Sequence, residues 1–157
     1  MLLMGSSTAK GQETVSSLDT ARFKGKWYIV AAIPAFYDKT WCSITDTYTW
    51  NSKGTLDVLT EYKKDTKGKT KSITQELRPL PESGFAKFVA KEWILKTYYW
   101  VLAVADDYSY AITGHPDKTY LYILSRTPEI EDSVYAKIVG IAAEKGYDTE
   151  KIKKVPR

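Results

Sequence analysis

The sequence predicts an all-β fold, an eight-stranded up-and-down antiparallel barrel with one C-terminal α-helix packed outside it. Three observations predict this fold. Short segments rich in β-branched and aromatic residues follow one another along the chain. Turn-forming residues separate neighbouring segments, without the βαβ alternation typical of a parallel sheet. Aromatic residues make up 13% of the chain, which suits large rings facing a barrel interior.

The expected strands cover residues 27–33, 44–50, 55–63, 70–78, 85–91, 98–105, 108–114 and 119–125. Turns such as residues 51–54, Asn-Ser-Lys-Gly, lie between them. After Pro128 the apolar spacing becomes helical over residues 130–145, and Gly146 is a natural stop. Residues 151–155 add one short strand. Barrel closure removes exposed sheet edges, and eight strands leave room for side chains or one small ligand.

The chain is long enough for one domain, which we expect over residues 18–157, preceded by a flexible tail over residues 1–17. Residues 1–7 contain too few apolar side chains for a signal peptide. No apolar run approaches the ~20 residues that a membrane-spanning helix needs. A monomer or weak dimer is expected.

Catalytic and metal chemistry find little support in the residue types. The single cysteine, Cys42, excludes a disulfide within the chain and a cysteine-cluster metal site. The single histidine, His115, lies in a turn and cannot build a metal cluster. We therefore expect no catalytic residues, no metal and no cofactor.

The net charge is +4, and five lysines gather in one short stretch: Lys63, Lys64, Lys67, Lys69 and Lys71. This stretch is either a solvated hairpin tip or a patch that attracts anions. It lacks the interleaved aromatic and arginine side chains of a nucleic-acid surface, so no nucleic-acid partner is expected.

Three segments, in order, resemble the motifs of the lipocalin family. The first is Gly25-Lys26-Trp27-Tyr28, the second includes Asp107 and Tyr108, and the third covers residues 120–128 with Arg126. Residues 144–151 are also similar to the end of the bacterial outer-membrane, plant temperature-induced and apolipoprotein-D branch. The resemblance covers residues 18–155. In a closed barrel Trp27 and Arg126 meet at one end, where the guanidinium can lie on the indole and donate to backbone carbonyls. We interpret both as structural residues.

The resemblance implies binding, transport or sequestration of a small hydrophobic or amphiphilic ligand inside the barrel, without catalysis. A fatty acid or lysophospholipid is favoured. The alternative is an interaction module that uses an aromatic and basic barrel rim on a membrane or protein. A lipid-converting enzyme using Cys42 is less favoured, because no basic partner for the thiol is evident. The branch resembled implies a periplasmic, outer-membrane or secreted protein, whereas the missing signal peptide leaves the cytoplasm or a membrane periphery open.

Strand alternation predicts which side chains face the interior. If Trp27 points inward, so do Ile29, Ala31 and Ile33. On the eighth strand the tyrosines face inward, whereas Leu121 and Ile123 lie under the helix. Resemblance to ligand-contacting positions of other lipocalins adds further members. The expected ligand-binding residues are Ile29, Ala31, Asp46, Tyr48, Thr60, Tyr62, Phe88, Tyr99, Val101, Ala111, Thr113 and Tyr122.

The interior is either a packed core or a ligand pocket. Buried tyrosine hydroxyls need partners, and small residues such as Ala111 and Thr60 leave volume unfilled, so a pocket is favoured. The expected rim comprises Phe36, Tyr37, Trp41, Trp93, Lys63 and Lys64. With these lysines, an acidic ligand head is expected at the rim and an apolar tail inside. The alternative is that the aromatic residues fold over the entrance as a lid.

Overall fold

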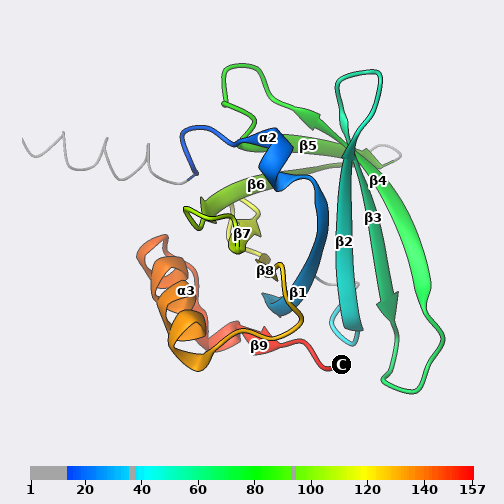
Figure 1. Ribbon diagram of the computed structural model, residues 1–157, viewed down its shortest axis with the longest axis vertical. Helices are drawn as coiled ribbons and strands as arrows, with labels where there is room; N and C mark the ends of the chain where they lie inside the picture. Colours follow the sequence, from blue (N-terminus) through cyan, green and yellow to red (C-terminus); the bar gives the residue numbers. More distant parts are fainter. Residues whose placement is uncertain (1–13, 36–37, 93–94) are drawn as a thin grey trace, which may run out of the picture.

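The computed structural model describes residues 14–35, 38–92 and 95–157 as a barrel with a helix against its wall (Figure 1). The barrel strands are β1 Gly25–Ile33, β2 Cys42–Trp50, β3 Leu56–Lys63, β4 Lys71–Pro79, β5 Lys87–Glu92, β6 Leu95–Val104, β7 Tyr110–Gly114 and β8 Leu121–Ser125. The remaining elements are the helices α2 Thr20–Phe23 and α3 Asp132–Glu144, the 3₁₀ turn η1 Thr149–Lys151 and the short strand β9 Lys153–Lys154.

Antiparallel pairing between consecutive strands builds the sheet, and strand β1 closes it. Strand β1 pairs with β8 on one side and with β2 on the other. The short strand β9 pairs with β1 at Ala31 and Ala32, past the segment that pairs with β2. The predicted eight-stranded up-and-down barrel with one C-terminal helix is therefore confirmed. Strands β5 and β6 reach closer to each other than predicted, because Glu92 pairs with Leu95.

Helix α3 covers the outside of the wall formed by strands β1, β6, β7 and β8 (Figure 1). Buried Ile138 and Ala142 of the helix pack with Ile112, Leu121 and Ile123 in one hydrophobic cluster. A second hydrophobic cluster lies inside the barrel. The two clusters give strands β7 and β8 apolar residues on both faces. No helix in the described ranges is long and apolar enough to cross a membrane.

The segment before β1 crosses one end of the barrel instead of trailing from it. The backbone N–H of Val15 donates to Val101 at 3.1 Å, and that of Leu18 donates to Gly84 at 2.8 Å. Asp19 then caps the short helix α2 by accepting from two backbone N–H groups. Val15, which lies in the expected tail, supplies apolar contacts to the core, as does Leu18. Residues 1–13 lie outside the described residues.

A bulge in strand β1 reverses the predicted side of Ala31. Opposite β8, Ile29 pairs with Leu124 but Ala31 pairs with the very next partner, Ile123, so one extra residue is accommodated. Alternation resumes one position out of step. Ala31 and Ile33 therefore pack in the cluster under helix α3, and the prediction that they face the interior is wrong.

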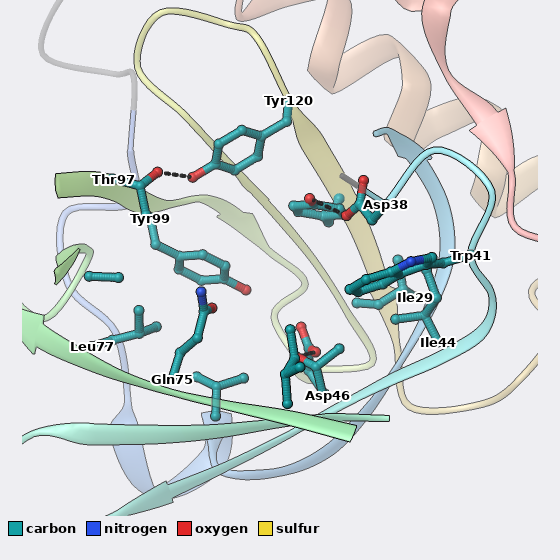
Figure 2. A pocket seen from close by; sticks show the side chains of 15 residues that line it. Ile29, Asp38, Trp41, Ile44, Asp46, Gln75, Leu77, Thr97, Tyr99 and Tyr120 are labelled. Atoms are coloured by element: carbon teal, nitrogen blue, oxygen red, sulfur yellow. Dashed lines mark hydrogen bonds between the residues drawn. The ribbon is translucent and has the colours of Figure 1, made fainter. Parts of the chain in front are cut away.

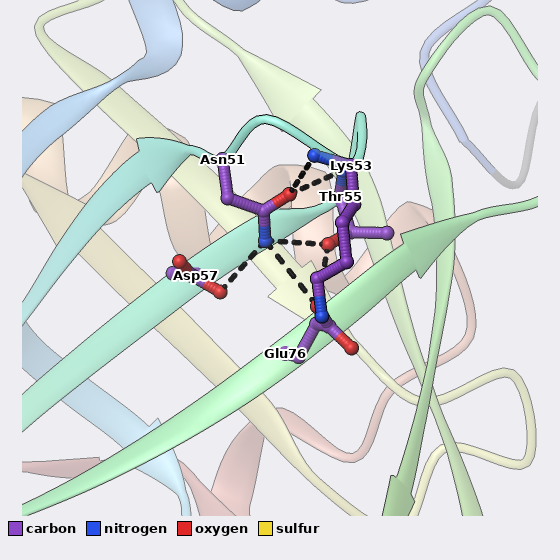
Figure 3. A network of polar contacts seen from close by, with 5 residues as sticks. All are labelled: Asn51, Lys53, Thr55, Asp57 and Glu76. Atoms are coloured by element: carbon purple, nitrogen blue, oxygen red, sulfur yellow. Dashed lines mark hydrogen bonds and ion pairs between the residues drawn. The ribbon is translucent and has the colours of Figure 1, made fainter.

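A polar network fixes the turn between β2 and β3 (Figure 3). The amide nitrogen of Asn51 donates to Thr55 Oγ1 at 2.6 Å and to Asp57 Oδ1 at 3.0 Å. Lys53 forms an ion pair with Glu76 at 2.9 Å, and its hydrogen bond to that carboxylate lowers the pKa of Glu76. The backbone N–H groups of Lys53 and Thr55 donate to the Asn51 oxygen. Asparagine at this position thus holds the hairpin by the turn chemistry expected from the sequence.

Candidate functional site: a cavity above a closed barrel end

One end of the barrel, where β1 begins and β8 ends, is closed by Arg126 and helix α2. The Arg126 guanidinium carbon lies 3.7 Å from the centroid of the buried Trp27 ring. Its nitrogens donate at 2.6–3.3 Å to four backbone carbonyls, those of Arg22, Phe23, Lys24 and Lys26. The Trp27 indole nitrogen donates to the Phe23 carbonyl at 2.8 Å. We call this arrangement the closed end.

The second motif also joins the closed end. The Tyr108 hydroxyl accepts the backbone N–H of Asp19 at 2.8 Å, and the Arg22 guanidinium lies over the Tyr108 ring at 4.5 Å. Asp107 accepts hydrogen bonds from Ser109, which lower the pKa of that carboxyl and fix the turn before β7. Gly25 has a φ of +95°, a backbone conformation that favours glycine. All five predicted motif residues therefore surround this end.

Above the closed end lies a cavity of about 290 Å³, close to the lower limit of typical small-molecule pockets (Figure 2). Strands β1 to β6 and β8 and the segment between β1 and β2 supply its walls. Aliphatic and aromatic side chains alternate there with a few polar groups. The lining residues are Ile29, Asp38, Trp41, Ile44, Asp46, Val58, Thr60, Ile73, Gln75, Leu77, Ala90, Thr97, Tyr99, Tyr120 and Tyr122.

Asp46 forms the polar part of the cavity nearest the closed end. It lies on β2 opposite Trp27 and accepts hydrogen bonds from Thr60 at 2.6 Å and Tyr48 at 3.2 Å. The Tyr48 hydroxyl is in turn hydrogen-bonded to that of Tyr99. Burial raises the pKa of Asp46 to about 6, against the lowering by these two donors. The cavity floor is thus a connected network of hydroxyls around one carboxyl.

Asp38 and Trp41 line the cavity where the chain passes from β1 to β2, at the end opposite Arg126, which we call the open end. Asp38 is buried and accepts the Tyr122 hydroxyl at 2.7 Å. Burial is the largest influence on its pKa, which is raised. The Trp41 ring stacks on Tyr62 with centroids 3.5 Å apart. The Tyr120 hydroxyl donates to the Tyr98 carbonyl, and it is also hydrogen-bonded to Thr97 Oγ1 at 3.4 Å. The open end is therefore aromatic and acidic.

The predicted ligand-binding residues divide into three groups. Five line the cavity: Ile29, Asp46, Thr60, Tyr99 and Tyr122. Six others face the barrel interior without lining the cavity, and they pack around it: Tyr48, Tyr62, Phe88, Val101, Ala111 and Thr113. Ala31 lies outside, under helix α3. Strand alternation therefore predicts which residues face the barrel interior better than it predicts which of those residues line the cavity.

Most lining residues absent from the prediction carried the same signal. Val58 alternates with Thr60, Ile44 with Asp46, and Ala90 with Phe88. Strand β4 contributes the alternating residues Ile73, Gln75 and Leu77, for which no inward residue had been predicted. Thr97 and Tyr120 likewise alternate with Tyr99 and Tyr122. Asp38 lies between strands, where no periodic signal exists.

The structure describes only some of the side chains predicted to form the rim. Trp41 lines the cavity. Lys63 ends β3, and Lys64 is exposed in the turn that follows it, but neither lines the cavity. Phe36, Tyr37 and Trp93 lie outside the residues whose side chains the structure describes.

Cys42 adds no chemistry to this cavity. The Cys42 thiol is buried and donates to the Lys63 carbonyl at 3.6 Å, which favours a packing role. Over the described part of the chain, no three histidine, cysteine, aspartate or glutamate side chains are grouped to hold a metal ion.

Comparison with known proteins identifies the class to which this barrel belongs. The family described as a lipocalin-like domain matches residues 18–157, so the chain belongs to the lipocalin family. It is 35% identical over 158 residues to temperature-induced lipocalin-1 of Arabidopsis thaliana, covering 94% of this chain and 84% of that protein. It is 30% identical over 150 residues to the outer membrane lipoprotein Blc of Escherichia coli, covering 90% of this chain and 81% of that protein.

Among solved structures, insecticyanin from the tobacco hornworm Manduca sexta superposes with a TM-score of 0.72 at 20% identity, covering 92% of this chain and 84% of insecticyanin. That likeness shows the lipocalin fold and confirms the barrel. Membership of the family implies binding of a small hydrophobic ligand by a protein class that is generally non-enzymatic.

Proposed function

We propose that the protein carries or sequesters one small amphiphilic molecule in the barrel cavity. The observation that supports this most strongly is a cavity of about 290 Å³, walled by apolar and aromatic side chains and provided with a few convergent polar groups. Closure of the opposite end by Arg126 leaves the Asp38 and Trp41 end as the route of entry. Binding then transfers apolar ligand surface from water to these walls.

The ligand has an apolar frame and at least one hydrogen-bonding group. The frame contacts side chains such as Ile29, Val58 and Leu77, and the polar group reaches Asp46 or Asp38. A fatty acid or lysophospholipid, as expected from the sequence, satisfies the first requirement. Its negatively charged head fits the second less well, because the lysines predicted to meet that head do not line the cavity.

The alternative of a membrane- or protein-binding rim depends mainly on Phe36, Tyr37 and Trp93, which are outside the described side chains. Trp41, the one rim aromatic residue that is described, stacks on Tyr62 and lines the cavity. Its position supports ligand binding inside the barrel and does not support a rim that binds a membrane or a protein.

Filling the cavity tests the proposal. The fluorescence of the neutral apolar probe N-phenyl-1-naphthylamine should rise and saturate with wild-type protein. Ala90→Trp places a large ring at a buried lining position and should abolish most of this signal, as should Val58→Phe on another wall. Ala143→Trp, on the exposed side of α3, is the matched control and should bind normally. Undiminished probe binding by folded Ala90→Trp and Val58→Phe proteins would disprove the proposal.

A further inference from the structure

The cavity is acidic although the protein as a whole is basic. The chain carries a net charge of +4. Its described cavity lining nevertheless contains two carboxyl groups, Asp38 and Asp46, and no lysine, arginine or histidine. In a partly desolvated space the sign of nearby charges acts strongly on a ligand, because water screens them little. The cavity therefore opposes a ligand carboxylate and favours a cation.

Asp38 has an unused hydrogen-bonding position. Only 7% of its surface is exposed. One carboxylate oxygen, Oδ2, accepts the Tyr122 hydroxyl, whereas Oδ1 has no hydrogen-bond partner of normal geometry among the described residues. A buried carboxylate oxygen without a donor costs free energy, which a donor on a bound molecule would recover. Asp38 can therefore accept one more hydrogen bond, such as one from the N–H of an amine ligand.

Asp46 adds a second negative charge at the other end of the cavity. Thr60 and Tyr48 each donate one hydrogen bond to it, and neither brings a positive charge. Asp38 raises the pKa of Asp46 further, so the two carboxyls act on each other across the cavity. An anionic head placed between them would meet repulsion from both.

Positive charges also lie near Asp38, outside the cavity. Lys39, Lys153 and Lys154 line a smaller hollow of about 60 Å³ beside the cavity, and Asp38 borders both spaces. All three lysines are exposed, and no ion pair joins any of them to Asp38 in the described ranges. The Lys154 nitrogen instead lies 4.9 Å from the centroid of the Tyr135 ring.

Aromatic rings complete a site for a cation. Trp41, Tyr99, Tyr120 and Tyr122 line the cavity together with the two carboxyls (Figure 2). The faces of such rings attract ammonium groups. We propose that the barrel binds a small amphiphilic amine, with its apolar frame against the walls and its protonated nitrogen beside the Asp38 carboxylate. This inference rests on the proposed function and narrows its ligand class.

Three ligands of equal chain length test the inference by calorimetric titration at neutral pH: decylamine, decanol and decanoate. Decylamine should bind about tenfold more tightly than decanoate, with decanol between them, since only the amine combines a hydrogen bond to Asp38 with attraction between opposite charges. If decanol binds, and decylamine and decanoate bind with equal affinity, the inference is overturned while the proposed function stands. Failure of all three ligands to bind would contradict the proposed function itself.

Variants assign the preference to Asp38. Asp38→Asn should lower the affinity for decylamine about tenfold and leave the affinity for decanol unchanged. Glu61→Gln changes the net charge equally on the outer face of β3, between the inward-facing Thr60 and Tyr62, and should change neither affinity. Asp38→Ala removes the carboxyl in a second way, so it should also lose the preference for decylamine and provides a second test if Asp38→Asn folds poorly. An undiminished preference for decylamine over decanoate in folded Asp38→Asn or folded Asp38→Ala would refute the role of Asp38.

Discussion

The two ends of the barrel differ in how completely a charged side chain is hydrogen-bonded. At the closed end, Arg126 donates to four backbone carbonyls and lies over the Trp27 ring. At the open end, Asp38 accepts one hydroxyl and keeps one oxygen without a partner among the described residues. Completed hydrogen bonding stabilises a fold, whereas an incomplete set beside a cavity leaves a position for a ligand. We therefore assign a stabilising role to the closed end and propose ligand binding at the open end.

The largest expected effect is at the closed end. Trp27→Ala removes a fully buried ring and should lower the free energy of unfolding by about 3–5 kcal/mol, measured by denaturant titration. Probe affinity of the remaining folded protein should be unchanged, because Trp27 does not line the cavity. Trp41→Ala is the matched change at the open end and should lower probe affinity with a smaller loss of stability. The reverse pattern would exchange the roles of the two ends.

A sharper comparison uses two adjacent residues of β8. Ile123→Ala should cost about 2–5 kcal/mol of unfolding free energy and leave binding intact, because Ile123 is fully buried under α3. Tyr122→Ala should enlarge the cavity and change probe affinity at a smaller stability cost, because Tyr122 lines it. Melting temperature and probe fluorescence measured together distinguish them. Altered binding in Ile123→Ala combined with altered stability alone in Tyr122→Ala would show that the faces are reversed.

The Asp46 carboxyl at the cavity floor should make the stability of the protein depend on pH. The folded state raises the pKa of Asp46 from 3.8 to about 6, so the folded protein holds this proton more tightly than the unfolded chain. Its stabilising contribution is complete below about pH 4 and is lost as the pH rises through about 6. Relative to Asp46→Asn, wild-type stability should therefore fall across this window, by up to about 3 kcal/mol.

Denaturant titrations of both proteins between these pH values measure this difference. Glu61→Gln, which removes a carboxyl from the outer face of β3, should not reproduce it. A difference between wild type and Asp46→Asn that stays constant with pH would contradict a raised pKa at the cavity floor.

The smallest effect is expected for the lysines outside the cavity. Lys63→Glu with Lys64→Glu should change unfolding free energy by less than about 0.5 kcal/mol, because both side chains lie at the surface. Decanoate and decanol affinities should change little, since neither lysine lines the cavity. A selective loss of decanoate binding that added salt reproduces would restore the sequence-based expectation of an acidic head at these lysines.

Strand alternation predicted the fold and much of the barrel interior because most positions obey two constraints at once. On β8, Tyr122 must face the cavity if Ile123 is to pack under α3, and the structure has both. The same rule failed at Ala31, where a one-residue bulge in β1 shifts the pairing. Bulges leave no signal in hydrophobic alternation, so the error could not be seen in the sequence.

The acidic character of the site was beyond sequence reasoning for a different reason. Asp46 shares its alternation with Tyr48 and was predicted to face inward. Asp38 lies in a connection between strands, and its burial depends on packing against Tyr122 of β8, 84 positions away along the chain. Only the closed barrel brings these two side chains together. The lysines of the expected rim therefore predicted an acidic ligand head, whereas the two carboxyls of the cavity lining support the basic ligand that we propose.

One spectrum compares the two ends directly. The indole N–H signals of Trp27 and Trp41, assigned by Trp→Phe variants, can be followed by ¹H–¹⁵N NMR during titration with decanol. Trp41 lines the cavity, whereas the Trp27 indole is buried at the closed end and hydrogen-bonded to Phe23. The Trp41 signal should move and saturate while the Trp27 signal stays in place. Movement of Trp27 with no change at Trp41 would contradict ligand binding at the open end.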